Sequence, residues 1–249
     1  MIRLVLAMND DLLRRAKAYP YRIPERSYFF ANGRERTVEN FSLPELSCRR
    51  PVLACGSNQS PERLAVKFAN IDGGPIPVIR VWLQDYDVVY SAHFTAYGSI
   101  PATLRYSPGT TVFLFVAWLT AGEQNRLHQT ESVGLNYDFG RLDGIEMEME
   151  MDGGAVLDRV FVYLSRHGCL AQNNAPIALS AIKAEGRKWP ALTEEQILGL
   201  ARDYLEPGVP LDDFILAAIA DEDLRRALGD ALEKHERPFA HPAFTPIAV

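Results

Sequence analysis

The spacing of apolar and polar residues predicts a strand-rich core that begins at residue 51. Val52 to Cys55 is a short apolar run, which is typical of a buried strand. Residues 78–83 and 86–92 are predicted strands, with a break between them at Gln84-Asp85. Thr111 to Leu119 is almost wholly apolar and rich in aromatic and β-branched residues, so we expect a central strand that is buried on both faces.

A second pattern, strict alternation with a period of two, occurs from Gly144 to Met151. Met and Ile lie on one face of this predicted strand and three glutamates on the other. Because like charges two residues apart project together into water, we interpret the glutamate row as a solvated face, not a metal site. A turn at 152–154 should lead into a partner strand at 156–164. Ser107-Pro108-Gly109 predicts another turn, just before the central strand.

Capping patterns and helical periodicity predict the helices. Ser60-Pro61 is a typical helix start. Thr120 and Glu123 have the spacing of a capping box, which opens a helix ending near Glu131. Further helices are predicted at residues 9–18, 176–185, 194–205 and 211–234, the last with a break near Asp221. These elements divide the chain into an N-terminal extension (1–50), a core (51–189) and a helical C-terminal extension (190–249).

Composition and charge narrow the class of protein. Of the 249 residues, 47% are hydrophobic and 23% are charged, which predicts a globular chain. The net charge of −6 and the lack of a sustained basic patch argue against nucleic acid as a partner. No apolar run approaches the roughly 20 residues of a membrane span, so we expect no membrane partner. Three widely spaced cysteines indicate a reducing compartment, for which we expect the cytoplasm.

The candidate binding element is the polar loop after the first core strand, Gly56-Ser57-Asn58-Gln59. Gly56 permits a tight backbone turn, and the loop N–H groups and the following helix start favour an anion such as a carboxylate or phosphate. The alternative is an ordinary turn between a strand and a helix. Cys55 is a candidate nucleophile, but its place at the end of a buried strand favours a packing role.

Glu131 is the candidate general acid/base. It falls at the C-terminal end of the capped helix, where the negative end of the helix dipole and apolar surroundings would disfavour its charged form and suit it to proton transfer. A surface glutamate at a frayed helix end is the alternative. Motifs for nucleotide binding, serine hydrolysis and zinc proteolysis do not occur in the sequence, and we expect no metal and no organic cofactor.

The order of these pieces resembles the γ-glutamylcyclotransferase-like family. Members open with a strand ending in Tyr-Gly-Ser-Asn, and Cys55-Gly56-Ser57-Asn58 is similar to it. The segments Gly98 to Leu104, Ser107 to Gly109 and Leu127 to Glu131 follow in the family order. Two residues depart from the pattern: Cys55 replaces the loop tyrosine, and Ser132 replaces the glycine after the catalytic glutamate.

The resemblance implies an α+β fold, a small mixed β-barrel flanked by helices. It implies that Glu131 is the acid/base, that Gly56, Ser57 and Asn58 bind substrate and that Tyr137 lies near them. We include Cys55 and Gln59, on either side of this loop, among the expected substrate-binding residues. The implied reaction is intramolecular cyclisation of a γ-glutamyl amide to 5-oxoproline, with release of an amine or amino acid. Two alternatives stay open: a non-catalytic binding or interaction module of the same fold, and an amide hydrolase that uses Cys55.

Overall fold

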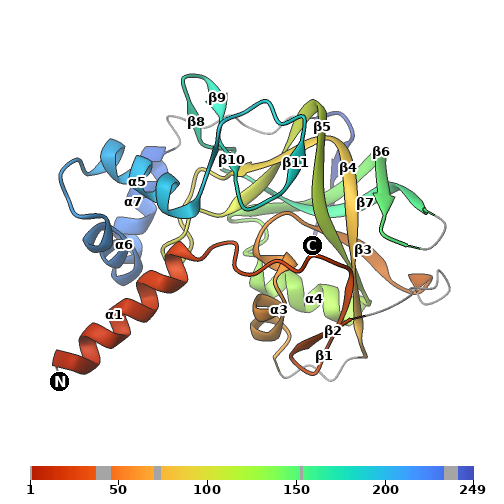
Figure 1. Cartoon of the computed structure of the whole chain (residues 1–249), viewed down its shortest axis with the longest axis horizontal. Coiled ribbons are helices and arrows are strands. Elements are labelled where there is room, and N and C mark those ends of the chain that lie inside the picture. Colours follow the sequence, from red (N-terminus) through yellow and green to blue (C-terminus); the bar gives the residue numbers. More distant parts are fainter. Residues whose placement is uncertain (1, 38–45, 70–73, 152–153, 233–240) are drawn as a thin grey trace.

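A closed, mixed β-barrel forms the centre of the computed structural model, which describes residues 2–37, 46–69, 74–151, 154–232 and 241–249 (Figure 1). Its strands follow the order β5-β3-β7-β6-β4, and β4 pairs back onto β5. Their bounds are Arg50–Ala54 (β3), Ile76–Tyr90 (β4), Ala102–Leu119 (β5), Tyr137–Met149 (β6) and Val156–Ser165 (β7). The β3–β7 pair is parallel and the other barrel pairs are antiparallel. The expected fold class is therefore confirmed.

The central strand predicted at 111–119 is the second half of β5, and it lies inside the sheet between β3 and β4. Its side chains alternate between two apolar clusters. Val112, Leu114 and Val116 join one cluster, whereas Phe115, Ala117 and Leu119 join the other. The run is continuously apolar because both of its faces are buried.

The two interruptions predicted in β4 and β5 were wrong, because both strands run straight through them. Asp85 has a φ of 64°, and the β4–β5 register shifts between Gln84 and Tyr86. Across from this bulge, Gly109 has a φ of 79°, and its N–H donates to Asp85 Oδ1 at 2.6 Å. Turn-forming residues here allow a β-bulge within two long paired strands instead of ending them.

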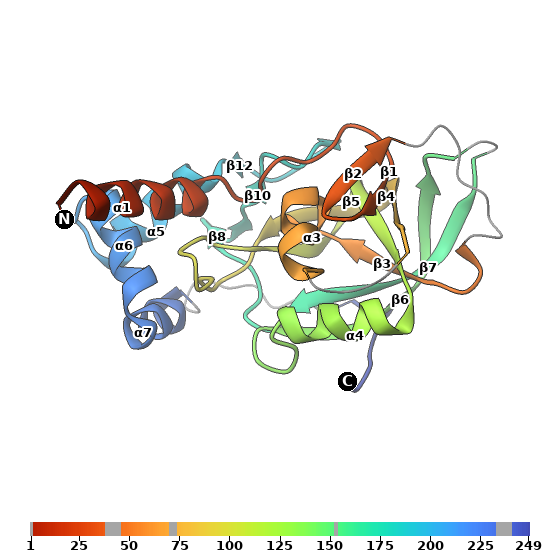
Figure 2. The ribbon, with the colours of Figure 1, turned by 90° about the horizontal axis from the view of Figure 1, so that it is seen from below.

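Two helices, α3 (Pro61–Lys67) and α4 (Ala121–Thr130), lie against one side of the barrel (Figure 2). The predicted capping box is present at the start of α4: Thr120 Oγ1 accepts from the Glu123 N–H, and Glu123 Oε2 accepts from the Thr120 N–H at 2.8 Å. Leu64 and Leu127 bury the inner faces of these helices in the same cluster as Phe115. The helix ends are therefore held against the barrel, where the candidate site lies.

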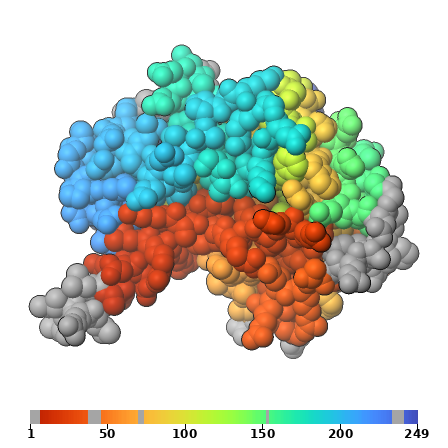
Figure 3. All heavy atoms as spheres, in the orientation of Figure 1, coloured from red at the N-terminus to blue at the C-terminus, as the bar shows by residue number. Residues whose placement is uncertain are grey.

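The two extensions pack on each other and on the barrel. The N-terminal part contains α1 (Ile2–Lys17), β1 (Tyr28–Ala31) and β2 (Arg34–Thr37), and β1 pairs with β4. The C-terminal helices are α5 (Glu194–Leu205), α6 (Leu211–Ala220) and α7 (Glu222–Leu232). The predicted break near Asp221 lies between the last two. Figure 3 shows the N-terminal segment crossing this face of the molecule beside the C-terminal helices.

The helix predicted at 176–185 was wrong. The segment forms short strands that pair along β4 and β5, with Ala178 opposite Val89 and Ala184 opposite Val112. Ile177, Ala178 and Leu179 are all fully buried in succession, which an extended segment inside the core allows and a surface helix does not. The short strands of the chain are Ala171–Gln172 (β8), Ala175–Pro176 (β9), Ala178–Leu179 (β10), Ala184–Glu185 (β11), Ala191–Leu192 (β12) and Phe244–Pro246 (β13).

Two further expectations concern the limits of the described ranges. The predicted turn at 152–154 and the predicted helix end at residue 234 fall wholly or partly outside the described residues. Of the helices in the described ranges, none combines the length and the apolar character needed to cross a membrane.

Candidate functional site

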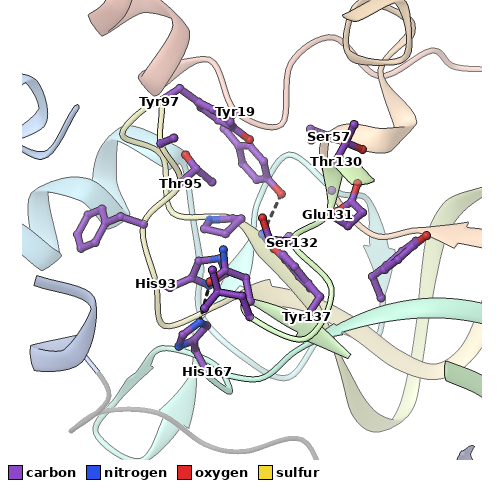
Figure 4. Close-up of a pocket in the computed structure, with 18 of the residues that line it drawn as sticks. Tyr19, Ser57, His93, Thr95, Tyr97, Thr130, Glu131, Ser132, Tyr137 and His167 are labelled. Atoms are coloured by element: carbon purple, nitrogen blue, oxygen red, sulfur yellow. Dashed lines mark hydrogen bonds between the residues drawn. The ribbon is translucent and has the colours of Figure 1, made fainter. Parts of the chain in front are cut away.

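A cavity of about 610 Å³ opens between the barrel, the loop after β3 and the C-terminal helix α7. Cys55, Gly56, Ser57 and Asn58 line it, together with Glu131 and Tyr137. In Figure 4, Ser57 and Glu131 lie across the cavity from His93 and His167, and Tyr19 and Tyr137 point into the space between. Six of the seven residues proposed from the sequence thus line one cavity.

Gln59 is the exception, because its side chain is fully buried beneath the loop. Its backbone N–H donates to the Gly56 carbonyl at 3.1 Å, and its own carbonyl accepts from the Tyr28 hydroxyl at 2.9 Å. The expectation that Gln59 faces the ligand was therefore wrong. A short 3-10 turn, η1 (Ser57–Gln59), directs this residue inward, where it supports the loop.

Gly56 lies against a tyrosine that sequence analysis missed. A Cβ atom at position 56 would lie 2.1 Å from the Tyr19 hydroxyl oxygen, so the close approach needs glycine. The same hydroxyl accepts a hydrogen bond from the Ala102 N–H at 2.8 Å. Tyr19 belongs to the N-terminal extension, and no local pattern marks it. It brings a ring and a hydroxyl to the cavity wall that also contains Cys55, the position at which the family that the sequence resembles has its loop tyrosine.

Glu131 caps the C-terminal end of α4, and it is held by two polar side chains. Asn58 Nδ2 donates to its Oε1 at 3.0 Å, and the Lys67 ammonium group forms an ion pair with the same oxygen. Lys67 also donates to Asn58 Oδ1 at 2.6 Å, which closes a three-residue network. The expected apolar surroundings of Glu131 are therefore wrong, because its carboxylate contacts the amide of Asn58 and the ammonium group of Lys67.

Lys67 is the second residue that sequence analysis missed. Its side chain is only 9% exposed, and that of Glu131 is 11% exposed, so the pair is largely shielded from water. Arg63 and Lys67 stand one helical turn apart on α3, which starts directly after the cavity loop, and both line the cavity. Their spacing of four residues is the sequence signal that could have identified them. Ser132, which follows Glu131, has a φ of 50°, in the left-handed region that favours glycine.

The far wall of the cavity carries an aromatic and histidine cluster. The His93 ring packs edge-on against Tyr137 at 5.6 Å and tilts against His167 at 4.6 Å between ring centroids. Burial lowers the pKa of His93 to about 3, and the nearby His167 acts in the same direction. His93 is therefore neutral near pH 7, with its Nδ1 in a 2.7 Å hydrogen bond with Ser91 Oγ. Burial also raises the pKa of the Tyr137 hydroxyl, so this group is a neutral hydrogen-bonding partner.

Cys55 lacks the properties of a reactive nucleophile. Its side chain is buried, and burial raises the pKa of the thiol to about 12. Reactive cysteines need a lowered pKa, because the thiolate is the attacking species. Across the described ranges, moreover, no group of three or more histidine, cysteine, aspartate or glutamate side chains could hold a metal ion.

Comparison with known proteins gives similarity in structure only. No protein-family model matches the sequence, and no curated protein matches it either. Similar solved structures include one named Gamma-glutamyl cyclotransferase, at 16% identity and a TM-score of 0.36, covering 78% of this chain and 91% of that one. An uncharacterized protein from Homo sapiens matches at 17% identity and a TM-score of 0.37, covering 78% of this chain and 92% of that one.

A third similar structure is a protein from Arabidopsis thaliana solved in solution, at 17% identity and a TM-score of 0.36. It covers 52% of this chain and 74% of its own. Likeness at this level carries no information on activity or substrate.

Proposed function

We propose that this protein cyclises a γ-glutamyl amide to 5-oxoproline and releases an amine or an amino acid. The observation that carries the proposal is the placement of Glu131 in one cavity with the backbone of Gly56, Ser57 and Asn58. A carboxylate beside a polar loop supplies a proton-transfer group next to hydrogen-bond donors, which an acyl-transfer step needs.

In this mechanism the α-amine of the substrate attacks its own γ-carbonyl carbon. A C–N bond closes the ring, and the original amide C–N bond breaks. Glu131 takes the proton lost by the attacking amine and returns it to the departing nitrogen. The Lys67 ammonium group pairs with Glu131 and lies beside the carboxylate that accepts the first proton. Since ring closure is intramolecular, correct folding of the bound substrate supplies much of the rate.

The loop offers donors for the substrate oxygens. Among the described turns, loops and caps, the backbone N–H groups of Gly56, Ser57 and Asn58 form no hydrogen bond with a backbone carbonyl. The N–H of Gln59, in contrast, donates to the Gly56 carbonyl. These N–H groups can bind the α-carboxylate or the oxyanion that develops on the γ-carbonyl. The neutral hydroxyl of Tyr137 supplies a further hydrogen bond.

A non-catalytic ligand-binding protein is the second candidate function. The Lys67–Glu131 ion pair favours it, because a carboxylate occupied by an ammonium group and by Asn58 has fewer lone pairs for proton transfer. A hydrolase with Cys55 as nucleophile is disfavoured, because burial raises the pKa of its thiol to about 12.

The test is a screen of γ-glutamyl amino acids, peptides and amines, measured in parallel for 5-oxoproline release and for binding by calorimetry. Release of 5-oxoproline in proportion to enzyme concentration supports the cyclotransferase. Binding of γ-glutamyl compounds without release would reject the reaction and support the second candidate. Neither binding nor release across the panel would reject both.

A further inference from the structure

The cavity is lined by four cationic side chains, and three of them are already engaged. These three are Lys67 with Glu131 and Asn58, Arg225 with the carbonyls of Ala218 and Ile219, and Arg226 with Glu222. Arg63 is different. Among the described residues its guanidinium has neither an ion-pair partner nor a hydrogen-bond acceptor, and the Nε atom is buried without one.

Two tyrosine rings hold Arg63 in place. The guanidinium carbon lies 5.3 Å from the centre of the Tyr21 ring and 5.1 Å from that of Tyr97. Such stacking attracts the cation through the ring faces and leaves the in-plane N–H groups of the guanidinium for other partners. Tyr97 also lines the cavity. Arg63 is thus fixed at the cavity wall with its donors unused.

The chemistry of the wall selects the kind of ligand. A partly desolvated guanidinium without an anion is unfavourable, and a planar carboxylate matches its N–H groups in pairs. The same cavity is also lined by Glu131, Glu222 and Asp230, whose negative charges disfavour a doubly charged anion such as phosphate. A singly charged carboxylate fits both conditions.

We propose that Arg63 is the ligand-carboxylate site of this cavity, held ready by Tyr21 and Tyr97. The inference rests on the proposed function for its choice of ligand, a γ-glutamyl amide. Such a ligand has two possible sources of the carboxylate: the α-carboxylate of the γ-glutamyl group, or the carboxylate of a departing amino acid. If Arg63 binds the latter, the protein prefers γ-glutamyl amino acids and peptides to γ-glutamyl amines.

Three ligands without an α-amine separate these sources, and none of them can cyclise. Glutaryl-alanine has both carboxylates, N-ethylglutaramate has only the one that matches the α-carboxylate, and butyryl-alanine has only that of the departing group. Their binding to the full chain is measured by calorimetry for the unmodified protein, Arg63→Met and Arg63→Lys. Arg14→Met, at the exposed Arg14–Asp11 pair outside the cavity, is the matched control.

We expect Arg63→Met to weaken the binding of glutaryl-alanine about 10- to 100-fold, the usual effect of losing hydrogen bonds to a charged group. Exactly one of the two mono-acids should lose affinity by a similar factor, and that one identifies the carboxylate. Arg63→Lys should lose less affinity, because it keeps the positive charge. If Arg63→Met melts at a lower temperature than the unmodified protein, the affinities of Arg63→Lys decide whether Arg63 binds the carboxylate. The control should change binding less than threefold.

The proposal is overturned if the Arg63 variants bind all three ligands within threefold of the unmodified protein. Equal losses for all three ligands, or no binding of any of them to the unmodified protein, would also overturn it. Because these ligands cannot react, the result is independent of 5-oxoproline release. A failure of the proposed reaction therefore shows in the turnover screen and not here.

Discussion

Two buried carboxylate–cation pairs in this protein have the same chemistry and different surroundings. Asp87 is fully buried on β4, and both of its oxygens accept from Arg187, at 2.8 and 2.9 Å. Arg187 also donates to the Ile182 carbonyl, and Asp87 accepts from the Val88 N–H, so this pair is satisfied by protein groups. The Lys67–Glu131 pair instead lines the cavity.

The difference shows what distinguishes a structural ion pair from a candidate functional one. The Asp87–Arg187 pair links β4 to the segment after β11, and neither residue lines the cavity. The Lys67–Glu131 pair instead shares its cavity with the loop of Gly56, Ser57 and Asn58, so a ligand in the cavity would meet its carboxylate. Burial and pairing alone do not separate the two roles, whereas access to the cavity does.

The largest expected effect is the loss of turnover when Glu131 of the Lys67–Glu131 pair is replaced. Glu131→Gln keeps the shape and the hydrogen bond with Asn58 but cannot relay a proton, so we expect turnover to fall about a hundredfold to ten-thousandfold. Ligand binding should change much less, since the loop contacts remain. Steady-state 5-oxoproline release and calorimetric binding measure the two effects.

The matched control for that variant is Glu62→Gln on the exposed face of α3, which should turn over normally. Thermal melting checks that both variants are folded. Near-normal turnover by Glu131→Gln would remove this residue from the mechanism and leave the binding protein as the better interpretation.

Breaking the Asp87–Arg187 pair should lower stability and leave ligand binding unchanged. Asp87→Asn removes the charge that neutralises Arg187, and breaking a buried pair from one side costs about 3–5 kcal/mol of the free energy of unfolding. Denaturant unfolding measures the loss. Ligand affinity per folded molecule should be unchanged, because the pair does not line the cavity.

Glu222→Gln is the control for Asp87→Asn. It breaks an exposed pair with Arg226, in which the glutamate side chain is 72% exposed, and should cost less than about 1 kcal/mol. Equal losses for the two variants would mean that burial does not set the strength of these pairs.

A third variant tests whether the cavity depends on the N-terminal extension. Gly56→Ala places a Cβ against the Tyr19 hydroxyl and should displace that ring from its hydrogen bond with Ala102. We expect a loss of about 1–3 kcal/mol in the free energy of unfolding, as for other overpacked sites, together with weaker ligand binding. Gly122→Ala is the control, since a Cβ there meets no atom within 4 Å. Unchanged stability and binding in Gly56→Ala would contradict the contact.

The smallest effect is expected at Cys55, inside the cavity wall. Cys55→Ser should keep most of any turnover, because the thiol has a pKa of about 12 and fills a wall position. The added hydroxyl should cost about 1 kcal/mol or more of the free energy of unfolding if it stays without a partner. Turnover rates at the same concentration of folded protein measure the effect on activity. Cys55→Ala, which adds no hydroxyl, is the control for the effect on stability. Complete inactivation, or a covalent adduct on Cys55 during turnover, would return the hydrolase to consideration.

The sequence by itself determined the elements whose signals are local. The apolar run at 111–119 marked a strand buried on both faces, and the spacing of Thr120 and Glu123 marked the start of α4 and thereby placed Glu131 at its end. The strand–loop–helix order around Gly56 located the loop that lines the cavity. In each case the residues that carry the signal lie within one element, so periodicity and capping chemistry report them directly.

Only the tertiary structure decided the features that depend on residues far apart in the chain. Lys67 meets Glu131 across 64 positions, and Tyr19 reaches Gly56 from the N-terminal extension. Residues 176–185 became strands because β4 and β5 offered partners for pairing, against a helical local pattern. Ion pairs, close backbone approaches and sheet edges form between elements, and their partners are set by packing, which no local pattern encodes.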